Sequence, residues 1–241
     1  MPIVAGFAFS LAIGASLAAG RGWRLPYAAL SAVIAAATVI IASGVHLPEA
    51  TRHTTFTLRH FADRTVWAPW VKIVNLVLAE FTVGIWAVTY LREVGGASPG
   101  AAPVLAMVFG LALFAVRMVT DRLQRTLGGW SIPVSLVVLG GAVAGLCVVE
   151  PLWARVTFLA VAGVGAGPLY PLSVDRFYAA AEHALDSVGL GAYCALASGA
   201  GVLIGPLLVG VAADAVGLRR AILLVPVLAL IGIVTQSPRR A

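Results

Sequence analysis

Long apolar runs separated by short polar joints dominate the chain. A helix that crosses the hydrocarbon core of a bilayer needs about 20 mostly apolar residues. Eight runs approach this length, at residues 3–20, 25–43, 70–91, 101–119, 131–149, 152–172, 189–212 and 217–235. The runs lack the period-two alternation of barrel strands. The pattern therefore predicts an all-α integral membrane protein with about eight transmembrane helices.

The composition agrees with this prediction and narrows the choice of partners. The sequence is 61% hydrophobic and 11% charged, whereas soluble domains are usually about a quarter charged. The basic residues are arginines except for Lys72, and they are scattered between apolar runs. This distribution gives no indication of nucleic-acid binding and is typical of the loops that orient membrane proteins. Alternate joints divide the basic residues ten to six, so we expect the richer side, with both termini, to be cytoplasmic.

The longest joint, residues 44–67, carries three histidines at intervals of seven residues: His46, His53 and His60. One helix face bearing three histidines could bind zinc. However, Pro48 would interrupt such a helix, and no cysteine or carboxylate completes a ligand set. We expect a solvated cytoplasmic linker here, and we expect neither a metal ion nor another cofactor anywhere in the chain.

Glu80 is a carboxylic acid in the middle of an apolar run. It lies ten positions after Trp70 and ten before Tyr90, which in a helix is about 15 Å to either end. A charge at that depth costs about 2.5 to 3.5 kcal/mol on insertion scales. Glutamate avoids this cost by facing a watery cavity, by pairing with a cation or by binding a proton.

The helical face that Glu80 occupies favours a neighbouring helix or a cavity over lipid. It carries the apolar residues Ile73, Leu76, Val77, Gly84 and Ala87. Two interpretations stay open: Glu80 binds solute hydroxyls or a proton in a central cavity, or it is a neutral side chain that pins two helices together. Asn75, Trp86 and Tyr170 are further cavity candidates, and simple packing is the alternative for each of them.

The joint after the fourth run reads AVRMVTDRLQRTLGG, with Arg117, Asp121, Arg122 and Arg125. It resembles the cytoplasmic loop signature of the major facilitator superfamily in its looser second-half form, with Val116 in place of the first glycine. In that family, such an aspartate among arginines suggests a latch that holds two helices in one conformation. The alternative is an ordinary positively charged loop.

Other segments resemble the same family in the same order. GWRLPY at 22–27 is similar to the turn between the fifth and sixth spans, GPLYP at 167–171 to the tenth span, and residues 199–221 to the eleventh span running into the twelfth. Gly201 and Gly205, followed by Pro206, form a small-residue pair that allows close helix packing. Gly163, Gly165 and Gly167 favour close packing and a helix broken at Pro168 and Pro171.

The run around Glu80 also resembles one subgroup of this family. Glu80, Gly84, Trp86, Tyr90 and Leu91 give the pattern E-x-x-x-G-x-W-x-x-x-Y-L. It is similar to the seventh span of the fucose-permease group and its bacterial relatives. The resemblance implies a multi-pass protein of a bacterial inner membrane.

The family fold has twelve spans in two halves, and this chain corresponds to spans five to twelve. Residues 1–43 would be the last two helices of the first half, 44–67 the cytoplasmic linker, and 68–241 the complete second half. The resemblance implies a truncated transporter that moves a small solute by alternating access, with a proton as the coupling ion and a sugar-like solute slightly favoured.

The sequence leaves three alternatives to solute uptake to consider. Drug or metabolite efflux is the first, although the first run lacks the glycine-proline motif of the drug antiporters. A remnant that inserts but transports nothing is the second. A membrane-embedded enzyme is not expected, because no histidine lies in mid-span and no Ser-His-Asp spacing occurs. The solute, the coupling ion, the direction of transport and the oligomeric state stay open.

Overall fold

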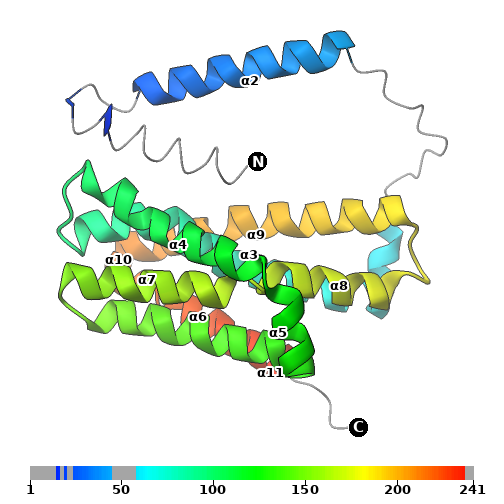
Figure 1. Cartoon of the computed structure of the whole chain (residues 1–241). Coiled ribbons are helices and arrows are strands. Elements are labelled where there is room, and N and C mark those ends of the chain that lie inside the picture. The colour runs from blue at the N-terminus through cyan, green and yellow to red at the C-terminus, as the bar shows by residue number, and fades with distance from the viewer. Residues whose placement is uncertain (1–14, 17–18, 21–23, 45–57, 237–241) are drawn as a thin grey trace.

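The chain folds into a bundle of helices, most of which lie side by side (Figure 1). The computed structural model describes residues 15–16, 19–20, 24–44 and 58–236, and no strand occurs among these residues. The helices are α2 (Arg24–Gly44), α3 (Arg64–Glu93), α4 (Ala101–Arg117), α5 (Thr120–Leu127), α6 (Ser131–Val148), α7 (Leu152–Ala166), α8 (Leu169–Ala181), α9 (Ser187–Val216), α10 (Leu218–Ala221) and α11 (Leu224–Gln236), with the 3-10 turns η1 (Leu58–Ala62) and η2 (Gly128–Trp130).

Five helical segments in the described part of the chain are long and apolar enough to cross a membrane. They are Arg64–Glu93, Thr120–Val148, Leu152–Ala181, Ser187–Val216 and Leu218–Gln236, and two shorter apolar helices cover Arg24–Ile40 and Ala101–Arg117. The prediction of an all-helical fold is confirmed for the described residues, and the long apolar helices are compatible with a membrane protein, whereas the expected count of about eight transmembrane helices is not confirmed. Every expected run from residue 25 onward is largely helical, although the run at 152–172 crosses the break between α7 and α8 and the run at 217–235 is divided between α10 and α11. The run at 3–20 lies almost entirely outside the described residues, as do His46 and His53.

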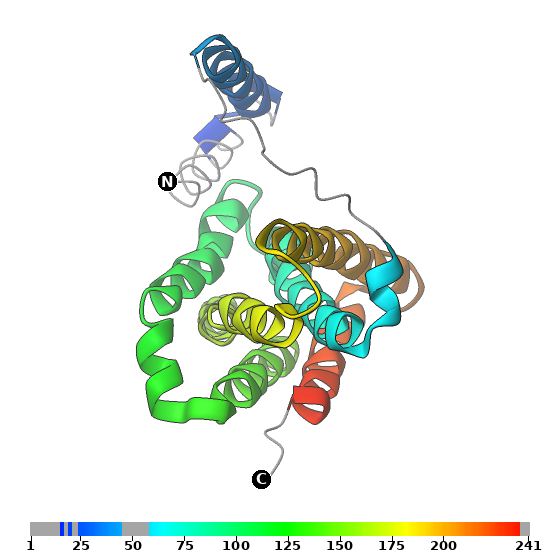
Figure 2. The same ribbon diagram turned by 90° about the vertical axis from the view of Figure 1, so that its right-hand side faces the viewer.

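Helix α3 is the centre of the bundle, since it contacts α4, α7, α8, α9 and α11. Figure 2 looks along the bundle and shows α8, α9 and α11 next to α3. The face predicted to turn inward does so: Ile73, Leu76, Val77 and Ala87 are buried, whereas Gly84 is exposed. Helix α2 lies away from the bundle in both views, and most of its side chains are exposed.

Helix α3 begins earlier than the apolar pattern indicates. Asp63 is its N-cap, and its carboxylate accepts hydrogen bonds from the Thr65 hydroxyl at 2.7 Å and the Thr65 backbone N–H at 2.8 Å. These two bonds hold the pKa of the Asp63 carboxyl below its usual range. An aspartate that accepts a backbone N–H is a favoured helix start. The last residues of the expected 44–67 linker are therefore helical.

Glycines bring the backbones of α6 and α7 close together. A Cβ atom at Gly165 on α7 would lie 2.5 Å from the backbone nitrogen of Leu139 and 2.8 Å from the carbonyl oxygen of Ser135, both on α6. Those contacts are with main-chain atoms, which cannot rotate away as a side chain can. Any side chain at position 165 would therefore force the two helices apart.

We expect Gly165→Ala to lower the free energy of unfolding by about 1–3 kcal/mol, the usual cost of overpacking. The matched control is Gly141→Ala on α6, because a Cβ atom there meets no atom within 4 Å. The control should be neutral or stabilising by up to about 1 kcal/mol, since alanine is the better helix former. Thermal unfolding of both variants in detergent checks this. Equal melting temperatures would contradict the close approach of α6 and α7.

Candidate functional site

Glu80 forms an ion pair with Arg117 inside the bundle. The carboxylate comes from the middle of α3 and the guanidinium from the last residue of α4, and Glu80 Oε1 lies 2.7 Å from an Arg117 terminal nitrogen. The Glu80 side chain is 7% exposed and the Arg117 side chain 30% exposed. The two charges neutralise one another, so the pair reduces the cost of placing either one among apolar helices.

Arg117 also binds the main chain at a helix break. Its Nε donates to the carbonyl oxygen of Gly167 at 3.1 Å. Helix α7 ends at Ala166 and α8 begins at Leu169, so the break expected at Pro168 and Pro171 falls at the first of these prolines. In a continuous helix the Gly167 carbonyl would accept from the N–H of residue 171, which as a proline has none. Arg117 therefore supplies the donor that Pro171 lacks.

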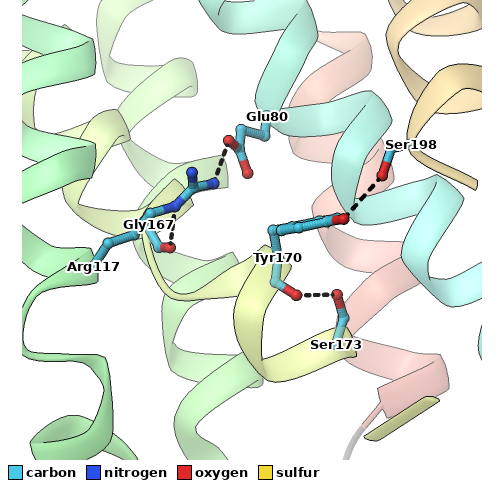
Figure 3. A network of polar contacts seen from close by, with 6 residues as sticks. All are labelled: Glu80, Arg117, Gly167, Tyr170, Ser173 and Ser198. Carbon is cyan, nitrogen blue, oxygen red and sulfur yellow. Dashed lines mark hydrogen bonds and ion pairs between the residues drawn. The ribbon is translucent and has the colours of Figure 1, made fainter. Parts of the chain in front are cut away.

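Arg117 thus connects three helical segments at one point. It ties α4, to which it belongs, to Glu80 on α3 and to the end of α7 (Figure 3). Backbone carbonyls inside a membrane need a donor from the protein, and a charged donor makes a stronger hydrogen bond than a neutral one. A displacement of the backbone at the break, or a change in the charge of Glu80, would each alter a hydrogen bond of this one guanidinium.

One oxygen of the Glu80 carboxylate has no hydrogen bond. Oε2 is buried and finds no partner among the residues that the structure describes. Figure 3 shows this oxygen pointing to the side of the site on which the Tyr170 ring lies. A buried acceptor left unsatisfied costs about 1–3 kcal/mol, more when it is charged. The free oxygen is therefore a place where a proton or a hydrogen-bond donor would bind favourably.

Tyr170 is the second predicted residue that lies at this site. It stands on the first turn of α8, directly after the break. Its phenolic oxygen is 3.2 Å from the hydroxyl of Ser198 on α9, and its carbonyl accepts from Ser173 at 2.8 Å. Tyr170 thereby links α8 to α9 (Figure 3).

The other two cavity candidates, Asn75 and Trp86, bind neighbouring helices and not the Glu80–Arg117 pair. Asn75 donates from Nδ2 to the carbonyl oxygen of Leu228 on α11 at 3.1 Å. Trp86 donates from Nε1 to the carbonyl oxygen of Pro206 on α9 at 3.1 Å. Neither residue shares the face of α3 that carries Glu80. Each contact joins α3 to a neighbouring helix, and the cavity role of either residue stays a prediction.

Trp86 also lies in a groove at one end of the α3–α9 seam. The groove has a volume of about 680 Å³, and Glu93 and Asp214 are among its lining residues. Further along the same seam the two helices approach closely, because α9 has glycines at the contact. Gly201 lies against Val77 and Leu78 of α3, and Gly205 lies against Leu78 and Thr82. Pro206 follows within α9.

The residues predicted to form a latch are separated in the structure. Asp121, Arg122 and Arg125 belong to the short helix α5, which runs across the end of the bundle (Figures 1 and 2). Arg125 Nε contacts the backbone oxygen of Asp121 at 3.3 Å. The Asp121 carboxylate makes no ion pair with any described residue. Arg117 lies with Glu80, and the latch stays a prediction.

Other arginines counted toward the orientation of the chain also bind the main chain. Buried Arg155 donates to the carbonyl oxygens of Val94 and Val149, the residues that follow α3 and α6. Arg219 donates to the carbonyl of Cys147 near the end of α6 at 2.7 Å. These side chains neutralise the partial negative charge of helix C-termini. They are structural groups as well as loop charges.

The sequence contains a signal for the Glu80–Arg117 pair. Arg117 lies inside the apolar run 101–119, just as Glu80 lies inside 70–91. The joint at 94–100 makes the two runs an antiparallel hairpin, and both charges lie well away from it along their helices. Opposite charges at similar depth in adjacent spans are a reason to expect pairing.

Comparison with known proteins does not identify the chain. No protein-family model matches it, and no curated protein matches its sequence. In the part of the chain that the structure describes, there is also no group of three or more His, Cys, Asp or Glu side chains suited to a metal ion.

Proposed function

We propose that this protein is a secondary active transporter that moves a small solute across a bacterial inner membrane by alternating access. The observation that carries the proposal is the buried ion pair of Glu80 and Arg117 at the break between α7 and α8. Ionisable groups among transmembrane helices commonly mark solute or proton pathways. Broken helices commonly form the binding sites of transporters.

The proposal includes the fold and coupling that the resemblance implies. The chain would be the second half of a major facilitator, residues 68–241, with the two preceding helices and the linker. Glu80 would take up the coupling proton, Tyr170 would line the solute site, and α8 would move about the break. Sugar-like uptake follows from the resemblance of the α3 sequence, and efflux is the opposite direction of the same cycle.

We expect Glu80→Gln to abolish proton-coupled transport while the protein still inserts and folds. The chain would be reconstituted in liposomes with a trapped pH dye, and solutes would be screened for those that drive proton flux. An amide side chain cannot take up the coupling proton, so proton flux in the variant should fall to that of liposomes without protein. The size-exclusion profile of the variant reports on its folding.

The matched control is Glu93→Gln, since Glu93 is an exposed carboxylate on the same helix. It should transport as the wild type does. Unchanged flux in Glu80→Gln would reduce Glu80 to a pin between α3 and α4. Flux that is absent from the wild type with every solute would favour the remnant that transports nothing.

A further inference from the structure

The charge balance at Glu80 and Arg117 restricts the kind of solute that a proton can accompany. The two side chains form a pair with no net charge, shielded on the Glu80 side and partly open on the Arg117 side. When Glu80 takes up a proton, its negative charge disappears and Arg117 keeps its positive charge, since arginine does not deprotonate in proteins. An unpaired cation in an apolar surrounding is strongly unfavourable.

A neutral solute leaves that imbalance in place. Its hydroxyl groups could fill the vacant position at Glu80 Oε2, but they bring no charge to compensate Arg117. An anionic solute does compensate it, because its carboxylate replaces that of Glu80 at the guanidinium. Protonation of Glu80 and binding of an anion at Arg117 therefore favour one another, whereas protonation and a neutral solute do not.

The geometry of Arg117 suits a carboxylate. Its Nε is held by the Gly167 carbonyl, which fixes the plane of the guanidinium. A planar guanidinium matches a carboxylate through paired hydrogen bonds. Arg117 retains 30% of its side-chain surface, so an incoming group could reach it.

No other charged group interferes with this exchange. Among the elements packed against α3, only α4 brings a charge to Glu80 in the described part of the chain, namely Arg117. From α8, Tyr170 is the titratable group at the site, and its hydroxyl is engaged by Ser198 of α9. The balance at the site is therefore set by one acid and one base.

We propose that the transported solute is a monocarboxylate, which replaces Glu80 at Arg117 as Glu80 takes up one proton. The inference rests on the proposed transport function and names its solute class. It differs from the sugar-like solute implied by the resemblance, because a sugar lacks the charge that Arg117 requires. The two charges enter together, and the site stays neutral throughout.

The test uses the full chain in lipid nanodiscs and three matched pairs of probes. Each pair is a carboxylate and the alcohol of the same skeleton: acetate and ethanol, lactate and propane-1,2-diol, gluconate and sorbitol. Binding is measured by calorimetry and proton uptake by a pH dye in weak buffer. We expect at least one carboxylate to bind with uptake of about one proton, and its alcohol to bind without any.

Two variants separate the two charges. Arg117→Gln should weaken binding of the carboxylate by roughly 10- to 100-fold. Glu80→Gln should retain the carboxylate but lose both the proton uptake and the rise in affinity at lower pH. A variant that only disturbed the fold would lower carboxylate binding and proton uptake together.

The remaining outcomes contradict the inference in distinguishable ways. If an alcohol binds as tightly as its carboxylate, or if a carboxylate binds without proton uptake, this inference is wrong, whereas proton flux driven by another solute in liposomes would still support the transport proposal. If no probe of either class binds and no solute drives proton flux in liposomes, the transport proposal fails and this inference fails with it.

Discussion

Arg117→Ala is expected to lower the free energy of unfolding by about 3–5 kcal/mol, the range measured when one partner of a buried ion pair is removed. The variant leaves Glu80 charged with no cation and leaves the Gly167 carbonyl without the donor that Pro171 cannot supply. Denaturant unfolding in detergent at neutral pH measures the loss.

The double variant Glu80→Gln/Arg117→Gln is the informative comparison. It leaves no unpaired charge, and buried ion pairs replaced by neutral groups of similar size often lose little stability. We therefore expect it to be more stable than Arg117→Ala. A double variant that is as unstable as the single one would show that the Gly167 contact, and not the ion pair, carries the stability.

Arg155→Ala is expected to lower the free energy of unfolding by about 3–5 kcal/mol. Arg155 is buried and donates to Val149 O at 3.0 Å and also to Val94 O. A hydrogen bond from a charged group contributes about 1.5–3 kcal/mol, and two carbonyls would lose their donor. The C-terminal ends of α3 and α6 would both be affected.

Arg92→Ala is the matched control, because Arg92 is an exposed arginine near the end of α3. It should change the free energy of unfolding by less than about 0.5 kcal/mol, as exposed surface substitutions do. Thermal unfolding of the two variants under the same conditions compares them. Similar melting temperatures would contradict the role of Arg155 at the two helix ends.

The helices and their inward faces could be predicted from the sequence, but their neighbours could not. Apolar length fixes the spans because the bilayer has a fixed thickness, and the face of Glu80 was predicted because helical periodicity is regular. Periodicity does not say which helix a face meets. Helical periodicity alone therefore could not show that Arg117 binds Glu80, or that Arg155 binds carbonyl groups at the ends of α3 and α6.

The short joint between α3 and α4 has a consequence for how the protein enters the membrane. Glu80 leaves the ribosome before Arg117, and a lone carboxylate at the centre of an inserting helix is unfavourable by about 3 kcal/mol. Only residues 94–100 separate the two helices. If α3 and α4 pass from the translocon into lipid as one hairpin, the acid meets its base before either faces hydrocarbon. The ion pair would then form during membrane insertion, before the rest of the bundle has assembled.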